Sequence, residues 1–247
     1  MKKSIWISFA FVLLFVSCVQ SKKSAFMVID SEAQKSNYSQ PISIEPLDGV
    51  TFEKNTIIIA PLQENQTYTL TGYFNGQIIS KTKNTILKLQ NVFLENKREK
   101  PALKATEKAE ISAVGGTKNY IRSWGRGFAK NAALQARKSL VIGGSGILFV
   151  QGDLCHGVEA DKLKIKGSGD FYIQGTKRGS AIRCKELTVE DDKSFKLWLL
   201  NSKNAVKSDD EITIKSGNFY LYDNDNSFVT YAPDSVHIEK SVKIETK

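Results

Sequence analysis

Four aromatic residues recur at one position of a repeated pattern in the C-terminal half of the chain. They are Phe149, Tyr172, Trp198 and Tyr220, and each lies between two apolar residues of a short alternating segment. Alternation with period two predicts a β-strand whose middle residue points away from the core. A column of flat rings on one outer face suits contact with the apolar faces of sugar rings, and Tyr222 widens it.

Two other interpretations of the aromatic column stay open. Rings on neighbouring strands stabilise those strands without any ligand. An apolar patch of this size is also often covered, by another segment of the chain or by a second copy of the protein.

Basic residues accompany a further aromatic residue in the segment RSWGRGFAK (122–130), where Arg122 and Arg126 flank Trp124. Arginine pairs with carboxylates through two parallel hydrogen bonds. We therefore expect this segment to contact the carboxylates of an acidic sugar.

The sequence offers little for catalysis. A glycoside hydrolase needs a pair of carboxylic acids at the scissile bond, and no repeat unit supplies stacked aspartates within a strand. The two histidines, His156 and His237, lie at different positions of the repeat with no nucleophile beside them. We predict a non-catalytic protein.

The elements that carry these residues follow from an internal repeat. From Asn131 onward the chain divides into five units of about two dozen residues, each with three short alternating strands. Three columns of apolar residues recur across the units: Leu134, Val158, Ile182, Val206 and Val229; Leu140, Leu163, Leu187, Ile212 and Val236; Leu148, Phe171, Leu197, Phe219 and Val242. Stacked units of this kind predict an all-β, right-handed parallel β-helix with about 24 residues and three strands per coil.

The same pattern extends upstream through residues 85–96 and 100–121. Leu103 precedes Leu134 by 31 residues, so this coil carries about seven extra residues, which we place in a loop at 122–130. Alternating strands at 67–80 are expected to form the N-terminal β cap that a solenoid needs. We assign residues 47–247 to a single β-helix domain.

The first residues predict export. Met1–Ser17 has a basic start and a short apolar run, as in a secretory signal peptide. The sequence FVSC at 15–18 resembles a bacterial lipobox, which implies that Cys18 is lipidated and anchors the protein in the cell-envelope membrane, with 18–46 as a tether. An ordinary secretory signal is the alternative. Cys155 and Cys184 lie at different points of the repeat, so we expect two buried free thiols.

The net charge points to an anionic partner. Removal of residues 1–17 takes away Lys2 and Lys3 and no acid, which leaves 35 − 2 − 26 = +7. Such a charge attracts anions at long range without defining a site. No nucleic-acid-binding motif is present, so we expect no nucleic-acid partner.

Several stretches together resemble a family of secreted bacterial parallel β-helix proteins that bind carbohydrate. The resemblance covers roughly residues 47–247 and rests on the stretches TLTGYFNGQII, LKLQNVFL, GGTKNYI, HGVEADKLKIKGSGDFYI and NAVKSDDEITIKSGNFYL. It implies binding of cellulose or an acidic plant polysaccharide, and it implies calcium.

The resemblance implies calcium, but the residues that open the coils of this chain differ from the family pattern. Coils of the family commonly open with Asn or Asp followed by Asp-Gly, whereas these coils open with residues such as Asn131-Ala132 and Ser180-Ala181. Calcium takes six to eight oxygen ligands. The acidic residues that could gather are Glu159, Asp161, Asp209, Asp210, Glu211, Asp223 and Asp225. Among these, the turn DNDN (223–226) is the best candidate for calcium, but its residues are more typical of a solvated turn, so calcium stays an alternative.

The sequence therefore predicts a lipid-anchored cell-envelope protein that binds an acidic or β-linked polysaccharide without cleaving it. A structural or adhesive surface protein that contacts another protein is one alternative. A polysaccharide lyase-like enzyme is the second.

Overall fold

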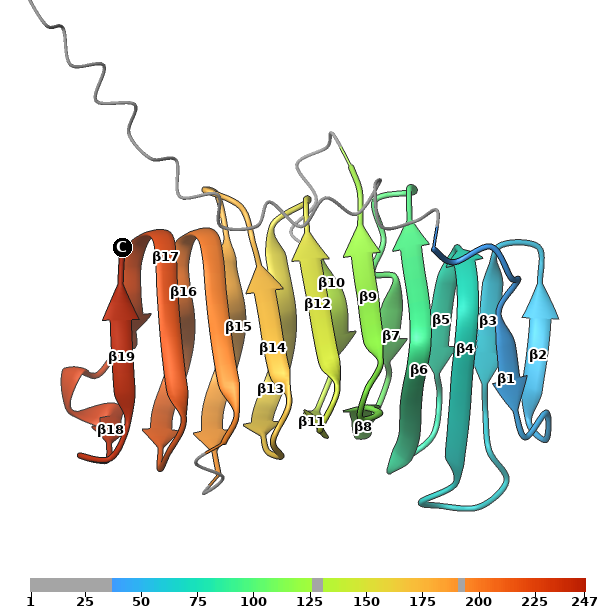
Figure 1. The fold of residues 1–247 in the computed structure, drawn as a ribbon, viewed down its shortest axis with the longest axis horizontal. Helices are drawn as coiled ribbons and strands as arrows, with labels where there is room; N and C mark the ends of the chain where they lie inside the picture. The colour runs from blue at the N-terminus through green and yellow to red at the C-terminus, as the bar shows by residue number, and fades with distance from the viewer. Residues whose placement is uncertain (1–36, 126–130, 191–193) are drawn as a thin grey trace, which may run out of the picture. The chain divides into compact units, whose positions relative to one another are not determined.

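The computed structural model describes residues 37–125, 131–190 and 194–247, which form a parallel β-solenoid of about eight turns with about 24 residues each (Figure 1). Each full turn contributes one strand segment to each of three stacks. This architecture confirms the all-β parallel coils expected from the repeat. Residues 1–36, including the predicted signal peptide and Cys18, lie outside the described part of the chain.

The first stack contains the strand that opens each coil. Its members are β3 (Thr56–Ile59), β5 (Gln77–Ser80), β7 (Leu103–Ala105), β10 (Ala132–Ala136), the first parts of β13 (His156–Ile165) and β15 (Ser180–Val189), the middle of β16 (Lys196–Ile214) and the end of β17 (Asn218–Val229).

The second stack follows after a bend or turn in each coil. It contains the first parts of β4 (Thr67–Asn75) and β6 (Thr85–Asn96), β8 (Ala109–Ala113), β11 (Ser139–Gly144), the last parts of β13, β15 and β16, and β18 (Val236–Ile238), which follows the short 3-10 helix η1 (Pro233–Ser235).

The third stack closes each coil. It contains the last parts of β4 and β6, then β9 (Lys118–Ser123), β12 (Ile147–Gly152), β14 (Asp170–Gln174), the first parts of β16 and β17, and β19 (Lys243–Thr246).

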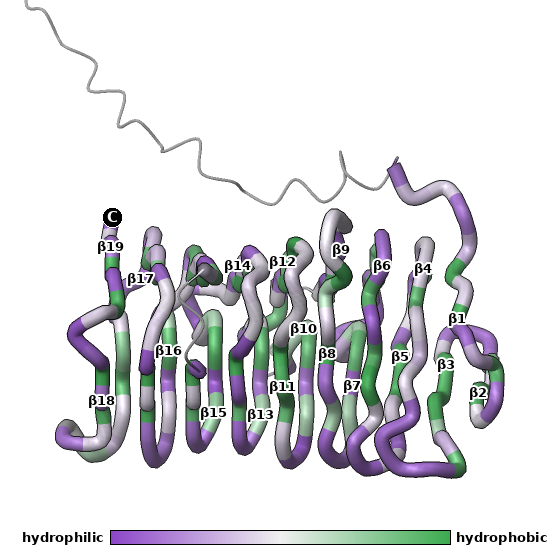
Figure 2. The backbone as a smooth tube through the Cα atoms, turned by 60° about the horizontal axis from the view of Figure 1, so that its bottom comes forward, coloured by the Kyte–Doolittle hydropathy of each residue, from purple (hydrophilic) through white to green (hydrophobic). Residues whose placement is uncertain are grey.

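The interior consists of the apolar columns predicted from the repeat. Strand register places Leu140, Leu163, Leu187, Ile212 and Val236 directly over one another. Nearly all inward residues of the middle coils are fully buried. Figure 2 shows hydrophobic residues along the strands and hydrophilic residues at many of the turns. Burial of these apolar columns is the main stabilising term of the fold.

Two column assignments in the last coil were wrong. Val206 pairs with Phe228 rather than Val229, because β17 runs through residues 223–226 at a constant offset of 22 residues from β16. Phe219 pairs with Ile244 rather than Val242. The spacing from coil to coil therefore varies by turn length, and a single period does not fix it.

The N-terminal cap differs in detail from the prediction. Residues 67–80 form β4 and β5, which already belong to parallel coils. Capping comes instead from two antiparallel strands, β1 (Ser43–Glu45) beside β4 and β2 (Val50–Glu53) beside β3. Because Ile44 of β1 is buried, the folded body begins before residue 47, inside the segment predicted as tether.

The coil with extra residues is present, since Leu103 pairs with Leu134 across 31 positions. Arg122 and Ser123 belong to β9, so the insertion begins after them. Residues 126–130, with Arg126, lie outside the described structure.

Both cysteines of the solenoid are buried, and neither is part of a disulfide among the described residues, as expected. Cys184 pairs with Ala160 in the first stack, whereas Cys155 lies in a turn before β13. Burial raises the pKa of the Cys184 thiol to about 12. No helix in residues 37–125, 131–190 and 194–247 combines the length and apolar character needed to cross a bilayer.

The repeated Gly-Ser-Gly turns allow neighbouring coils to approach closely. Gly144 has φ +102, and a Cβ on it would overlap the Ala113 carbonyl oxygen of the coil below. Gly167, one coil later, has φ +92 and lies in the same way over Gly144. Both the left-handed backbone and the lack of space require glycine here.

Alanine substitutions at two glycines, Gly144 and Gly116, test whether the turn requires glycine for steric reasons. Gly144→Ala is expected to lower the free energy of unfolding by about 1–3 kcal/mol more than Gly116→Ala. Gly116 also has positive φ (+74), but nothing lies within 4 Å of a Cβ there, so it isolates the backbone contribution. Urea unfolding of both variants measures the difference, and equal losses would contradict a steric role for Gly144.

Candidate functional site

The aromatic column of the third stack is longer than the sequence suggested. Phe149, Tyr172, Trp198 and Tyr220 pair in register from coil to coil, as predicted. Phe93 of β6 and Tyr120 of β9 continue the column towards the N-terminus. We call these six residues the aromatic ladder. The two additional members could have been found by carrying the register into the upstream coils.

Successive rings of the ladder stack on one another. Their centroids lie 5.4, 4.6, 4.7, 5.4 and 3.8 Å apart in chain order, with interplanar angles between 8° and 22°. Because each inner ring has a ring on both sides, its two faces are covered. The ladder therefore presents ring edges to its surroundings, and the flat sugar platform expected from the sequence is not available along it.

The N-terminal end of the ladder is covered by the chain itself. Tyr38 lies 5.5 Å from Phe93 and 5.8 Å from Tyr120, measured between ring centroids, and its hydroxyl donates to the Lys118 carbonyl at 2.7 Å. Tyr120 and Phe149 are only 5% and 6% exposed.

The C-terminal rungs of the ladder, Tyr172, Trp198 and Tyr220, are half-buried. The part of the ladder that a ligand could reach therefore lies in the C-terminal half.

Tyr222 does not widen the accessible surface, although the sequence suggested it. Its side chain is buried, and its hydroxyl donates to Glu245 Oε1 at 3.0 Å. Loss of solvation, together with the Glu245 carboxylate, raises the pKa of Tyr222 to about 12. Lys247 Nζ lies 5.4 Å from the ring centroid. These contacts tie the last coil to its neighbour.

Arg122 and Trp124, which were predicted to contact a sugar carboxylate, already have partners within the protein. The Arg122 guanidinium lies 3.2 Å from the Trp124 ring centroid, and its Nε donates to Asp153 Oδ2 at 2.9 Å. Lys97 approaches the same ring at 5.6 Å. The Trp124 ring thus already has a cationic partner, a contact that stabilises this corner of the solenoid.

The acidic residues named for calcium face cations instead. Asp209 accepts two hydrogen bonds from Arg183, at 2.6 and 2.7 Å. Lys177 Nζ lies 3.0 Å from Asp223 and 3.2 Å from Asp225.

Of the remaining calcium candidates, Asp210 and Glu211 are exposed beside Asp209 on β16, and Glu159 and Asp161 line the groove described below. Across the described ranges no three histidine, cysteine or acidic side chains gather as metal ligands would. These carboxylates do not fit a calcium site as they stand.

The histidines lie in different stacks, as the repeat indicated. His156 Nδ1 accepts a hydrogen bond from the Ser180 amide at 3.0 Å, and its Nε2 lies 3.4 Å from Cys155 Sγ. His237 is exposed on β18. The expectation that no nucleophile lies beside either histidine was therefore wrong for His156, which contacts a buried cysteine thiol. Neither histidine lines the polar groove described below.

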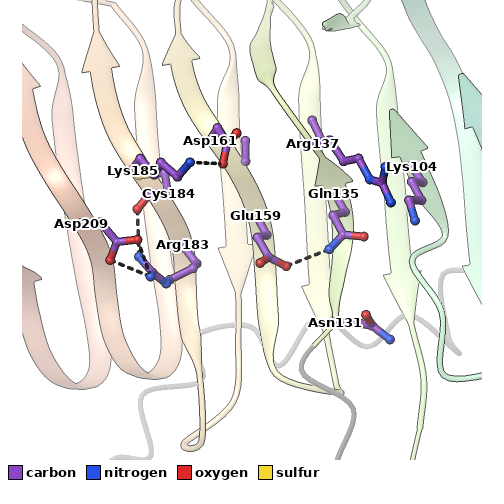
Figure 3. Close-up of a pocket in the computed structure, with 12 residues that line it drawn as sticks. Lys104, Asn131, Gln135, Arg137, Glu159, Asp161, Arg183, Cys184, Lys185 and Asp209 are labelled. Carbon is purple, nitrogen blue, oxygen red and sulfur yellow. Dashed lines mark hydrogen bonds and ion pairs between the residues drawn. The ribbon is translucent and has the colours of Figure 1, made fainter. Parts of the chain in front are cut away.

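A groove of about 510 Å³ runs over the outer face of the first stack (Figure 3). We call it the polar groove. Its lining residues are Lys104, Asn131, Gln135, Ala136, Arg137, Glu159, Ala160, Asp161, Arg183, Cys184, Lys185 and Asp209. Most of these were not predicted as site residues, although Lys104, Gln135, Glu159 and Arg183 occupy the same outward position on successive strands. The reasoning that found the aromatic column could have found them.

Interactions within the polar groove pair some of its charges. Lys185 Nζ lies 3.2 Å from Asp161, and Arg183 holds Asp209. Gln135 Nε2 donates to Glu159 Oε2 at 3.0 Å. Loss of solvation raises the pKa of Glu159, an effect that Gln135 and Arg183 partly offset.

The raised pKa of Glu159 predicts a pH-dependent contribution to stability. The folded state favours the protonated carboxyl, so folding is helped below the unfolded pKa and this help is lost as pH rises through the folded pKa. Glu159→Gln, which keeps an acceptor for Gln135, is expected to be more stable than wild type at pH 7. The difference should vanish at pH values below 4.5, the unperturbed pKa. Urea midpoints at both pH values measure it, and a constant difference would contradict the pKa direction.

Comparisons with known proteins give one family and one fold neighbour. A family model described as "Carbohydrate-binding domain-containing protein" matches residues 53–245. No curated protein matches the sequence. A solved structure described as a polysaccharide lyase-like protein from C. thermocellum, a gadolinium derivative, is similar with a TM-score of 0.53. That similarity covers 80% of this chain and 90% of the other at 16% identity, so it supports the fold alone.

Proposed function

The chain belongs to the carbohydrate-binding domain-containing protein family over residues 53–245, and we propose from this membership that it binds a polysaccharide without cleaving it. The family match is the observation that carries the proposal. Both the acidic character of the polysaccharide and the absence of cleavage are parts of the proposal.

The geometry of the solenoid suits a linear polymer. Equivalent side chains on successive coils lie about 4.8 Å apart along the axis, so any outward column offers a repeated contact to a repeated chain. Tyr172, Trp198 and Tyr220 form the half-buried part of the ladder. Their ring edges and the two tyrosine hydroxyl groups can contact sugar hydroxyl and C–H groups, whereas Trp198 Nε1 is buried. The +7 charge favours an acidic polysaccharide over a neutral one.

A glycan array tests the proposal directly. The purified protein is expected to bind β-linked or uronate-containing polysaccharides, with stronger signals for the acidic ones at low salt. Absence of binding to every glycan would contradict the proposal and would favour an adhesive protein that contacts another protein.

We expect no turnover of a bound acidic polysaccharide. The carboxylates Asp209, Asp223 and Asp225 are held by cations, and the Cys155 thiol that contacts His156 is buried. Prolonged incubation with polygalacturonate should give no rise in the absorbance of unsaturated products. A rise that scales with protein concentration would replace the binding proposal with a lyase.

Export and lipidation belong to the same proposal, supported by the basic start, the apolar run and Cys18. Mass spectrometry of the protein isolated from a bacterial envelope should find an N-terminal lipid-modified Cys18. A mature chain that begins elsewhere without lipid would contradict this assignment.

A further inference from the structure

We propose that the polar groove is a second binding site, which takes one anionic sugar unit and holds its charged group between Lys104 and Arg137. The charged group is an oxyanion on a sugar ring, either a carboxylate or a sulfate. The inference rests on the proposed function, because it assigns the recognition of the acidic unit to a particular face of the solenoid.

The two cations are the first observation. Lys104 of β7 and Arg137, which follows β10, point toward one another across adjacent coils (Figure 3). Neither side chain has a hydrogen-bond or ion-pair partner within the described residues, whereas the other two cations of the groove, Arg183 and Lys185, are paired with Asp209 and Asp161. Two neighbouring cations without a counter-charge repel each other, and an anion between them removes that repulsion. The planar guanidinium of Arg137 can bind a carboxylate or sulfate through two hydrogen bonds.

The second observation is a pair of polar side chains that could bind the hydroxyl groups of the sugar. Next to the two cations lie the Gln135 amide and the Glu159 carboxylate, which are joined by one hydrogen bond from Gln135 Nε2 to Glu159 Oε2. A carboxylate can accept about four hydrogen bonds, so Glu159 retains acceptors for sugar hydroxyl groups. The incomplete solvation of this carboxylate, which raises its pKa, is relieved when hydroxyl groups donate to it.

Size and charge agree with a single sugar ring and its neighbours. The groove volume of about 510 Å³ lies within the range of small-molecule sites, about 300–1,000 Å³. Its lining carries four cationic and three anionic side chains, and the excess positive charge lies at the Lys104–Arg137 end. The groove is on the first stack and the aromatic ladder is on the third, so the two sites can be removed independently.

The test removes the two cations and compares acidic with neutral probes. Lys104→Gln/Arg137→Gln is expected to weaken binding of polygalacturonate, or of dextran sulfate, by about tenfold or more, because two charge-assisted contacts are lost. Binding of hydroxyethylcellulose, a neutral probe, should not change. Lys104→Arg/Arg137→Lys preserves both charges and should keep most of the affinity.

A matched control removes two positive charges elsewhere. Lys83→Gln/Lys88→Gln changes two exposed lysines away from the groove, with Lys88 on the second stack, and has the same net charge as the test variant. It should reduce acidic binding by no more than about twofold. Circular dichroism and urea midpoints confirm that both double variants are folded.

Each outcome decides the inference. Loss for polygalacturonate alone identifies a carboxylate site, and loss for dextran sulfate alone identifies a sulfate site. Equal losses in the test and control variants, or unchanged acidic binding in the test variant, overturn the groove and leave the proposed function standing. A wild-type protein that binds only the neutral probe also overturns the groove alone, whereas a wild-type protein that binds no probe overturns the proposed function itself.

Discussion

Replacing Phe171 with alanine is expected to lower the free energy of unfolding by about 3–5 kcal/mol, a loss typical of a fully buried aromatic residue. Phe171 is 0% exposed and lies between Leu148 and Leu197 of the adjacent coils. Truncation therefore opens a cavity shared by three coils. In a solenoid the stability of each coil depends on its contacts with its neighbours, so the loss should be transmitted along the stack.

The adjacent residue supplies the control. Tyr172 lies next to Phe171 on β14 but points outward, where it stacks between Phe149 and Trp198. Tyr172→Ala is expected to cost about 1–2 kcal/mol, because it removes ring stacking and leaves the interior filled. Urea unfolding measures both losses. Equal losses would show that the inward and outward assignment of β14 is wrong.

Truncation of the half-buried part of the ladder should have the largest effect on function. Tyr172→Ala/Trp198→Ala is expected to weaken polysaccharide binding by about tenfold or more, since both ring edges and the Tyr172 hydroxyl group are removed. The measurement is the dissociation constant for a polysaccharide that the wild type binds on the glycan array.

A second ladder variant separates binding from stability. Tyr120 stacks in the same ladder but is 5% exposed beneath Tyr38. Tyr120→Ala should therefore lower stability without changing affinity. If Tyr120→Ala and Tyr172→Ala/Trp198→Ala weaken binding equally, the ladder acts through the stability of the fold and does not contact the ligand.

Most of the fold could be predicted because its physical cause is local and periodic. Alternation of apolar residues fixes which side chains face inward, and recurrence of Leu140, Leu163 and Leu187 at spacings of 23 and 24 residues fixes which strands stack. The different positions of Cys155 and Cys184 in the repeat likewise predicted that the two cysteines are not joined in a disulfide. Prediction failed at Phe228 and Ile244, because the length of a turn is not fixed by the strands that flank it.

The site was less predictable than the fold. An alternation with period two fixes the direction of each Cα–Cβ bond but not the plane of an aromatic ring. The sequence therefore placed Tyr172 and Trp198 outward without showing that their ring faces cover one another. The partners of the acidic residues were also hidden, because Lys177 and Asp223 are 46 residues apart in sequence.

The polar groove was overlooked for a different reason. Its outward column consists of different residue types, whereas the aromatic column is chemically uniform and easily recognised. Lys104 and Arg137 also belong to coils separated by the 122–130 insertion, which breaks the constant spacing of the repeat.

Titration calorimetry of the wild-type protein with polygalacturonate and with hydroxyethylcellulose tests the central claim most directly. A saturable interaction with at least one of them is predicted, tighter for polygalacturonate and weakened by added salt, because the protein carries excess positive charge. No heat of binding with either polymer, from a protein shown to be folded, would contradict a carbohydrate-binding function for this solenoid.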